Sequence, residues 1–257
     1  MENLANYFFI VARESGAESS NIPAWANKNS NPIMLDENLD SNVKRVKLSN
    51  LPGSFQLLNV LAKEECERFK IQTEKLGYLE DAAVSLPRSV RHNNSLTWII
   101  DEETHNIIWN RIEKYMHDDD SIFNGKKALG LNKRFRFYKY DKGDFFKIHT
   151  DGAWPGSLVI NNKLINDAYP DRFSQMTFLI LLNEDFKGGA TQFYIDEQNP
   201  LKPARNISNS KIENIRTPIG GVLCFPHGMH PLHCLHSSEE ILKGVKYIIR
   251  TDVLFEK

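Results

Sequence analysis

This sequence has few cysteines, few long apolar runs and almost no net charge. Its 257 residues contain three cysteines, Cys66, Cys224 and Cys234, which are too few and too scattered for the disulfide framework of a secreted protein. Cys224 and Cys234 flank a turn and could pair, but we expect reduced thiols in an intracellular compartment. No Cys-x-x-Cys spacing indicates a zinc or redox motif.

The apolar stretch nearest the N-terminus, Tyr7 to Ala12, is too short for a membrane span and for the core of a signal peptide. We therefore expect a cytoplasmic protein without membrane attachment. Lys plus Arg number 32 and Asp plus Glu 33, so the net charge of −1 argues against nucleic acid bound mainly through overall charge. The length suits one large domain or two small ones, and the oligomeric state is left open.

The chain divides into three segments that differ in composition and in the period of their apolar residues. Residues 1–45 show no sustained period and predict a weakly ordered leader, with a short helix at Leu4 to Ala12. Residues 46–130 predict a helical support region, because apolar residues at steps of three and four favour helices over 62–76 and 102–117. Asp101 is the expected N-cap of the second helix.

Residues 131–257 predict a strand-rich core. We expect strands over 134–140, 176–182, 191–195, 221–225 and 246–255, the second of them buried on both faces. No helical period separates these strands, which excludes a doubly wound parallel sheet and favours an antiparallel sandwich or barrel with helices packed against it. The long connections 154–173 and 196–217 are typical of functional covers.

Five of the eight histidines fall in two places, and these places suggest a metal site. On an extended segment His149 and Asp151 point the same way, so an imidazole and a carboxylate can reach a common point. The other four lie at steps of three after the strand over 221–225: His227, His230, His233 and His236. Two histidines and one carboxylate make the facial triad that holds Fe(II), and spacing alone leaves all four open as the third ligand.

Two cations, Lys246 and Arg250, share one face of the last predicted strand with Ile248. A buried cation is costly unless it meets an anion, which a dicarboxylate cosubstrate would supply. For Arg250 an ion pair with Asp252 is an equal alternative.

Several segments together resemble the iron(II)- and 2-oxoglutarate-dependent oxygenases, in particular the prolyl 4-hydroxylase-like branch. The similar segments, in order, are Tyr140-x-x-Gly-x-x-Phe146-x-x-His149-x-Asp151, Leu182-Asn183-x-Asp-Phe-x-Gly-Gly-Ala-Thr191-x-Phe193, Pro218-x-x-Gly221, Leu235-His236 through Lys246, and Arg250-Thr-Asp-Val253. The resemblance covers about residues 85–255. It implies a double-stranded β-helix, a jelly-roll or cupin-like barrel, over 131–257, supported by N-terminal helices.

The family's register favours one of the four histidines as the distal ligand. The family places a Lys ten residues after this ligand and a small residue at plus eight, which His236 satisfies with Lys246 and Gly244. His233 has Lys243 at plus ten but lacks the small residue, and it remains the alternative. The resemblance thus implies that His149, Asp151 and His236 bind iron, with no catalytic residue beyond them.

The resemblance also implies a cosubstrate site. Lys246 is expected to pair with the far carboxylate of 2-oxoglutarate, and Tyr140, Thr191 and Arg250 are expected near it. One departure is Leu181, where this branch often carries a Tyr, and we expect Thr177 or Arg250 to replace that hydroxyl. Asp151 is retained, which favours hydroxylation over halogenation.

The implied activity is a dioxygenase that uses O2 and 2-oxoglutarate to hydroxylate an unactivated C–H bond, releasing succinate and CO2. Ascorbate is an implied accessory. A peptidyl, prolyl-like residue is the leading substrate, with Arg136, Tyr138, Trp154 and Arg91 as candidate contacts. An oxygenase of a free amino acid or small metabolite, and a non-enzymatic metal-binding barrel, are the alternatives.

Overall fold

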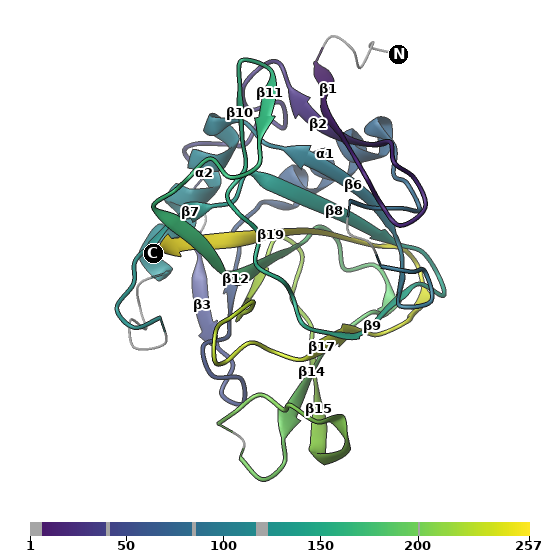
Figure 1. Ribbon diagram of the computed structural model, residues 1–257, viewed down its shortest axis with the longest axis vertical. Helices are drawn as coiled ribbons and strands as arrows, with labels where there is room; N and C mark the ends of the chain where they lie inside the picture. Colours follow the sequence, from purple (N-terminus) through teal and green to yellow (C-terminus); the bar gives the residue numbers. More distant parts are fainter. Residues whose placement is uncertain (1–6, 40–41, 84–85, 117–122, 200) are drawn as a thin grey trace.

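The protein is described by a computed structural model that covers residues 7–39, 42–83, 86–116, 123–199 and 201–257. Most of its regular structure is β-strand, in two facing sheets with two α-helices beside the larger one (Figure 1). The predicted class, mainly β with supporting helices, is confirmed.

The larger sheet has ten strands in the order β1-β2-β6-β8-β19-β12-β16-β4-β3, with β7 paired to β19. Their bounds are β1 Phe8–Glu14, β2 Ile22–Asn27, β3 Lys44–Lys47, β4 Phe55–Leu58, β6 Asn94–Ile99, β7 Ala128–Leu131, β8 Arg134–Tyr140, β12 Arg172–Leu181, β16 Val222–Pro226 and β19 Lys246–Glu256.

The smaller sheet has five strands in the order β15-β14-β17-β9-β5. Their bounds are β5 Arg91–His92, β9 Phe145–His149, β14 Thr191–Asp196, β15 Ser210–Ile215 and β17 His236–Ser238. Two further strand pairs stand apart from both sheets: β10 Leu158–Ile160 with β11 Lys163–Ile165, and β13 Lys187–Gly188 with β18 Ile241–Lys243.

Apart from the pair β14–β15, which stays in the smaller sheet, the core strands from β8 to β19 alternate between the two sheets along the chain. Neighbours in the larger sheet are β8-β19-β12-β16, and neighbours in the smaller one are β15-β14-β17-β9. In Figure 1 the strands β9, β14 and β17 lie opposite β8, β12 and β19. Antiparallel strands that pass back and forth between two facing sheets form the double-stranded β-helix, or jelly roll.

Strand β12 shows why its sequence is continuously apolar. Phe178 and Ile180 pack into the core between the larger sheet and the helices, whereas Leu179 and Leu181 point into the barrel interior. Because successive side chains on a strand point to opposite faces, a strand buried on both sides needs apolar residues at every position.

The two helices close the outer face of the larger sheet. Helix α1 spans Lys63–Leu76 and α2 spans Glu102–Ile112, followed by the 3-10 turn η2 (Glu113–Tyr115). Asp101 caps α2 as predicted, since its side chain accepts a hydrogen bond of 3.0 Å from the Thr104 backbone N–H. The α2 helix is shorter than the predicted 102–117, and residue 117 lies outside the described residues.

The expected helix at Leu4 to Ala12 is wrong where the structure describes it, because this segment is strand β1. Residues 1–6 lie outside the described residues. The nominal leader also contains β2, whose alternate residues Ile22, Ala24 and Ala26 are buried. Pairing of β2 with β6 outweighs weak local preference, so these strands of the leader join the same sheet as the core strands.

One smaller expectation changed, and the expectation of reduced thiols agrees with the structure. The connection over 196–217 contains strand β15. The sequence did not predict this strand because its side chains are mostly polar and solvent-facing. The thiols of Cys66, Cys224 and Cys234 are buried and free, so Cys224 and Cys234 do not pair. Among the described residues, no helix is both long and apolar enough to cross a membrane.

Candidate functional site

Two histidines and one carboxylate meet inside the barrel mouth. Strand β9 ends at His149, β17 begins at His236, and the two residues are direct partners in the β9–β17 register. Asp151 follows β9 after one residue. One ligand atom from each of the three side chains lies within 4.8 Å of the others, including 3.7 Å from His149 Nε2 to Asp151 Oδ1 and 3.8 Å from His236 Nε2 to Asp151 Oδ2.

Backbone carbonyls orient both imidazoles. His149 Nδ1 donates to the Lys147 carbonyl at 2.7 Å, and His236 Nδ1 donates to the Cys234 carbonyl at 3.1 Å. A carbonyl only accepts hydrogen bonds, so Nδ1 carries the proton and the Nε2 lone pair of each neutral ring points toward Asp151. This is the tautomer in which two histidines ligate a metal through Nε2.

The charge state of the cluster also suits a metal ion. Burial, with the neighbouring His236 adding to it, lowers the pKa of His149 to about 3, and burial also lowers the pKa of His236. Burial alone would raise the pKa of Asp151, but the Arg250 guanidinium and the nearby histidines hold this pKa well below 3.8. Two neutral imidazoles and a carboxylate at neutral pH are the donors that a divalent transition metal prefers.

The structure brings His236, and not His233, to His149 and Asp151. His233 Nδ1 instead bonds to the His230 carbonyl at 2.9 Å, and the His230 ring packs on Phe123 with 4.9 Å between ring centroids. His227 lies behind Asp151 and contacts Thr177, as described below. The steps of three between the histidines left this choice open and the family's register favoured His236, which the pairing of β17 with β9 brings to His149.

The cluster opens into a cavity of about 40 Å³ inside the barrel. Predicted cosubstrate residues Tyr140, Thr191, Lys246 and Arg250 all line it, as does Tyr138. Lys246 and Thr191 also line a second cavity of about 350 Å³, with Leu181 and Arg216 on its wall. The Lys246 side chain therefore belongs to the walls of both cavities.

Lys246 is a buried cation, with 2% of its surface exposed. Its ammonium donates to the Gly189 carbonyl at 2.7 Å and to Ser238 Oγ at 3.3 Å, and its nitrogen lies 5.4 Å from the centre of the Tyr140 ring. Among the residues that the structure describes, no carboxylate forms an ion pair with it. Burial, with Arg216 nearby as a second cause, lowers the pKa of Lys246 to about 7, so an anion in the cavity would restore its charge.

The side chains of Arg250 and Thr177 both contact the carboxylate of Asp151. Arg250 Nε lies 3.4 Å from Asp151 Oδ2, and its Nη2 lies 3.1 Å from Asp252 Oδ1. Thr177 Oγ1 donates to Asp151 Oδ2 at 2.6 Å. The contacts of Thr177 therefore do not support the expectation that it replaces the hydroxyl missing at Leu181.

The four candidate substrate residues form two neighbouring stacks. The guanidinium of Arg91 lies 5.5 Å from the Tyr138 ring centroid, and that of Arg136 lies 4.6 Å from the Trp154 centroid. Arg136 also pairs with Asp252 at 3.3 Å, so much of its charge is already used inside the protein. Tyr138 is the member of this set that lines the metal-side cavity.

Sequence reasoning missed the role of Phe146. Its ring stacks on His149 with 3.5 Å between centroids and 13° between planes, and it lines the same cavity. The signal was present, since Phe146 stands in the motif that ends at His149 and Asp151. A phenyl ring stacked on an imidazole restricts the orientation of the imidazole and keeps water from one of its faces.

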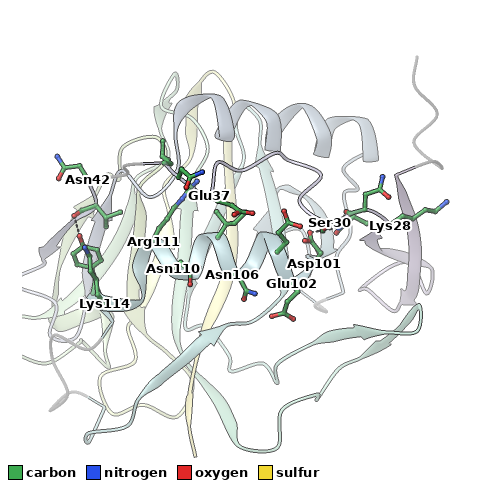
Figure 2. Close-up of a pocket in the computed structure, with 18 residues that line it drawn as sticks. Lys28, Ser30, Glu37, Asn42, Asp101, Glu102, Asn106, Asn110, Arg111 and Lys114 are labelled. Atoms are coloured by element: carbon green, nitrogen blue, oxygen red, sulfur yellow. Dashed lines mark hydrogen bonds between the residues drawn. The ribbon is translucent and has the colours of Figure 1, made fainter.

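A much larger hollow, of about 1210 Å³, lies beside α2 and does not include the cluster. Figure 2 shows Asp101, Asn106 and Arg111 on its wall. Asp101 is used to cap α2, and Arg111 pairs with Glu65 at 2.8 Å, so these charges serve the fold. Size alone does not make this hollow the functional site.

Comparison with known proteins supports the fold. No family model and no curated protein matches the chain. A prolyl hydroxylase from Trichoplax adhaerens, in complex with a hypoxia inducible factor oxygen degradation domain peptide fragment, has 15% identity and a TM-score of 0.54, covering 80% of this chain and 85% of that one.

Two further solved structures have TM-scores of 0.47. The viral collagen prolyl hydroxylase from Paramecium Bursaria Chlorella virus-1, in its 2OG complex, is 15% identical over 82% of this chain and 100% of its own. A Pseudomonas putida prolyl-4-hydroxylase is 14% identical over 80% of this chain and 93% of its own. The likeness to the Trichoplax protein shows a shared fold, the same fold that the sequence motifs imply.

The low imidazole pKa values predict weak pH dependence of metal binding. Two ordinary histidines would lose roughly tenfold in metal affinity between pH 8 and pH 6, because both must release protons. Since burial lowers the pKa of His149 to about 3 and also lowers that of His236, we expect a change well below tenfold. Titration of the metal-free protein with Co(II), followed by absorption at several pH values, measures this, and a tenfold loss would contradict it.

Proposed function

We propose that the chain is an Fe(II)- and 2-oxoglutarate-dependent dioxygenase that hydroxylates an unactivated C–H bond. The observation that carries this proposal is a pair of features in one cavity. A cluster of two neutral imidazoles and a carboxylate lines it, and so does a buried ammonium without a carboxylate partner among the described residues. A metal ion and a dicarboxylate would satisfy both features at once.

The residues present fit an iron ion. His149, Asp151 and His236 would hold it, and three protein ligands leave positions open for other groups. Bound iron would supply the activation of O2 for hydroxylation, coupled to conversion of 2-oxoglutarate into succinate and CO2. The protein's own residues would bind, orient and exclude water around that chemistry.

Lys246 would bind the far carboxylate of 2-oxoglutarate. Its ammonium has three N–H donors and uses two of them on Gly189 and Ser238, which leaves one for an anion. Thr191 is the hydroxyl residue that shares both cavities with Lys246, so we propose it, and not Thr177, as the neighbour that compensates for Leu181. Tyr140 packs against the same ammonium.

The rest of the cavity wall is largely apolar. Leu179, Phe225 and Ile248 line it, and all three belong to the buried core of the barrel interior. An apolar lining keeps water away from the metal and strengthens the electrostatic contacts made there. The same apolar lining surrounds Lys246, which is buried.

We further propose a peptidyl, prolyl-like substrate. The Trichoplax prolyl hydroxylase that shares this fold was solved with a peptide, which makes a peptide the first class to test. Arg91 and Tyr138 would lie at the substrate side of the cavity, since Arg91 stacks between Tyr138 and Phe146. Ascorbate would act as an accessory reductant.

Anaerobic titration with Fe(II) and 2-oxoglutarate tests the chemistry. We expect a metal-to-ligand charge-transfer band when both are present and neither alone, and succinate formation once O2 is admitted. A protein that shows neither would be a non-enzymatic barrel, and the proposal would be wrong.

A peptide library, assayed beside free amino acids by mass spectrometry, tests the substrate class. A mass increase of one oxygen on a prolyl peptide is the expected result. Oxygen added only to a free amino acid would replace the peptide proposal with a small-molecule one and leave the oxygenase chemistry intact.

A further inference from the structure

A chain of buried hydrogen bonds runs from the carboxylate of Asp151 into the larger sheet. Thr177 Oγ1 lies 2.6 Å from Asp151 Oδ2 and 2.8 Å from His227 Nδ1, and His227 Nε2 lies 2.6 Å from Ser174 Oγ. Ser174 and Thr177 belong to β12, and His227 directly follows β16. The exposed fractions of Ser174, Thr177 and His227 are 3%, 0% and 1%.

The direction of each hydrogen bond follows from counting protons. A carboxylate is ionised at neutral pH and only accepts, so the single hydroxyl proton of Thr177 is donated to Asp151. The Thr177 oxygen must then accept from His227, whose Nδ1 carries the proton. A neutral imidazole with its proton on Nδ1 accepts at Nε2, and Ser174 donates there.

The series of hydrogen bonds ends on one oxygen of the Asp151 carboxylate, Oδ2. Thr177 and Arg250 both contact Asp151 Oδ2, at 2.6 and 3.4 Å. Oδ1 is the oxygen nearer to His149, at 3.7 Å. Holding Oδ2 from behind fixes the rotation of the carboxylate, which leaves Oδ1 facing His149 and sets the 3.8 Å separation between Oδ2 and His236 Nε2.

The backbone of residues 227–228, just after β16, also hydrogen-bonds to β12 and to Asp151. The His227 backbone N–H donates to the Gln175 carbonyl at 2.9 Å, and the Gly228 N–H donates to the Asp151 carbonyl at 3.0 Å. The backbone of the segment therefore spans from β12 to the residue whose side chain it orients. An ordinary buried histidine needs hydrogen-bond partners, but these partners end on the one carboxylate of the cluster.

We propose that Thr177 and His227 are positioning residues that orient Asp151 for metal binding and thereby set metal affinity. The inference rests on the metal site of the proposed function, but it makes a separate claim about two residues that do not touch the metal. Partners of metal ligands typically contribute roughly 10- to 100-fold to metal affinity. We expect a loss of that order without Thr177's hydroxyl.

The experiment measures Mn(II) binding to the metal-free full-length protein by the EPR signal of free Mn(II), without 2-oxoglutarate. Thr177→Val keeps the side-chain shape and removes the donor, and we expect roughly 10- to 100-fold weaker binding. Thr177→Ser restores the hydroxyl and should bind within about threefold of wild type. His227→Leu should weaken binding less than Thr177→Val, because Thr177 can still donate to Asp151 without its own partner.

Two controls separate positioning from general destabilisation. Thr251→Val makes the same change at another fully buried threonine of the same sheet, whose hydroxyl donates to the Asn132 carbonyl at 2.6 Å. It should leave Mn(II) affinity unchanged. In the double variant Thr177→Val/His227→Leu, affinity should equal that of Thr177→Val alone, because His227 acts through the threonine hydroxyl.

The outcomes distinguish this inference from the proposed function. Equal Mn(II) affinity in wild type and Thr177→Val overturns the positioning role while the metal site stands. Equal losses in Thr177→Val, Thr177→Ser and Thr251→Val also overturn it, because they would reflect packing. Failure of the wild type itself to bind Mn(II) overturns the metal site and this inference together.

Discussion

Replacement of His236 by alanine is expected to abolish metal binding and succinate formation. The side chain supplies one of only two imidazoles in the cluster, and its Nε2 faces Asp151 at 3.8 Å. A bound metal contributes several kcal/mol to the reaction, so its loss lowers kcat/KM by roughly 1,000-fold or more. Mn(II) titration and succinate release measure the two effects separately.

His233→Ala is the matched control, because His233 is the alternative ligand on the same segment. Its ring contacts the His230 carbonyl, away from His149 and Asp151. Both readouts should therefore stay within about threefold of wild type, as for a residue outside a functional site. If His233→Ala abolishes binding and His236→Ala spares it, the assignment of the distal ligand is wrong.

Replacement of Lys246 by methionine is expected to weaken 2-oxoglutarate binding strongly while leaving Mn(II) binding intact. Removing one partner of a buried ion pair typically costs about 3–5 kcal/mol, which corresponds to roughly 100- to 5,000-fold in affinity. Methionine keeps the length and the apolar contacts of the stem. Titration of 2-oxoglutarate into the Mn(II)-loaded protein measures the loss.

The same variant should change how stability depends on pH. Burial lowers the pKa of Lys246 to about 7 in the folded protein, against 10.5 for an ordinary lysine. Between these values the unfolded chain binds more protons than the folded one, so this group makes wild-type stability rise with pH. Denaturant unfolding from pH 7 to 10 should show that this contribution is absent from the Lys246→Met protein.

Lys243→Met provides the comparison for both measurements. Lys243 lies ten residues after His233, in β18, and its side chain is exposed. It should alter neither 2-oxoglutarate affinity nor the pH dependence of stability. Equal effects of the two lysine variants would argue against Lys246 as the anchor of the cosubstrate.

The sequence by itself determined the fold class and five core strands, β8, β12, β14, β16 and β19. The two-residue period of residues 134–140 predicted β8, and a continuous apolar run predicted β12, because such local patterns are typical of strands. The other strands were not expected, among them β1, β2, β6 and β15. Pairing with a partner strand, and not their own composition, makes β1, β2 and β15 strands.

The sequence also determined which residues carry the candidate chemistry. His149, Asp151, His236 and Lys246 were all expected from motif spacing, and one cavity contains them. Only the tertiary structure decided how their neighbours act. Thr177 was expected at the cosubstrate, yet it contacts Asp151 and His227. Arg250 lines the cavity and also pairs with Asp252, which was the equal alternative for it. Spacing specifies which face of a strand a side chain occupies, whereas its partners depend on the register between strands far apart in the chain.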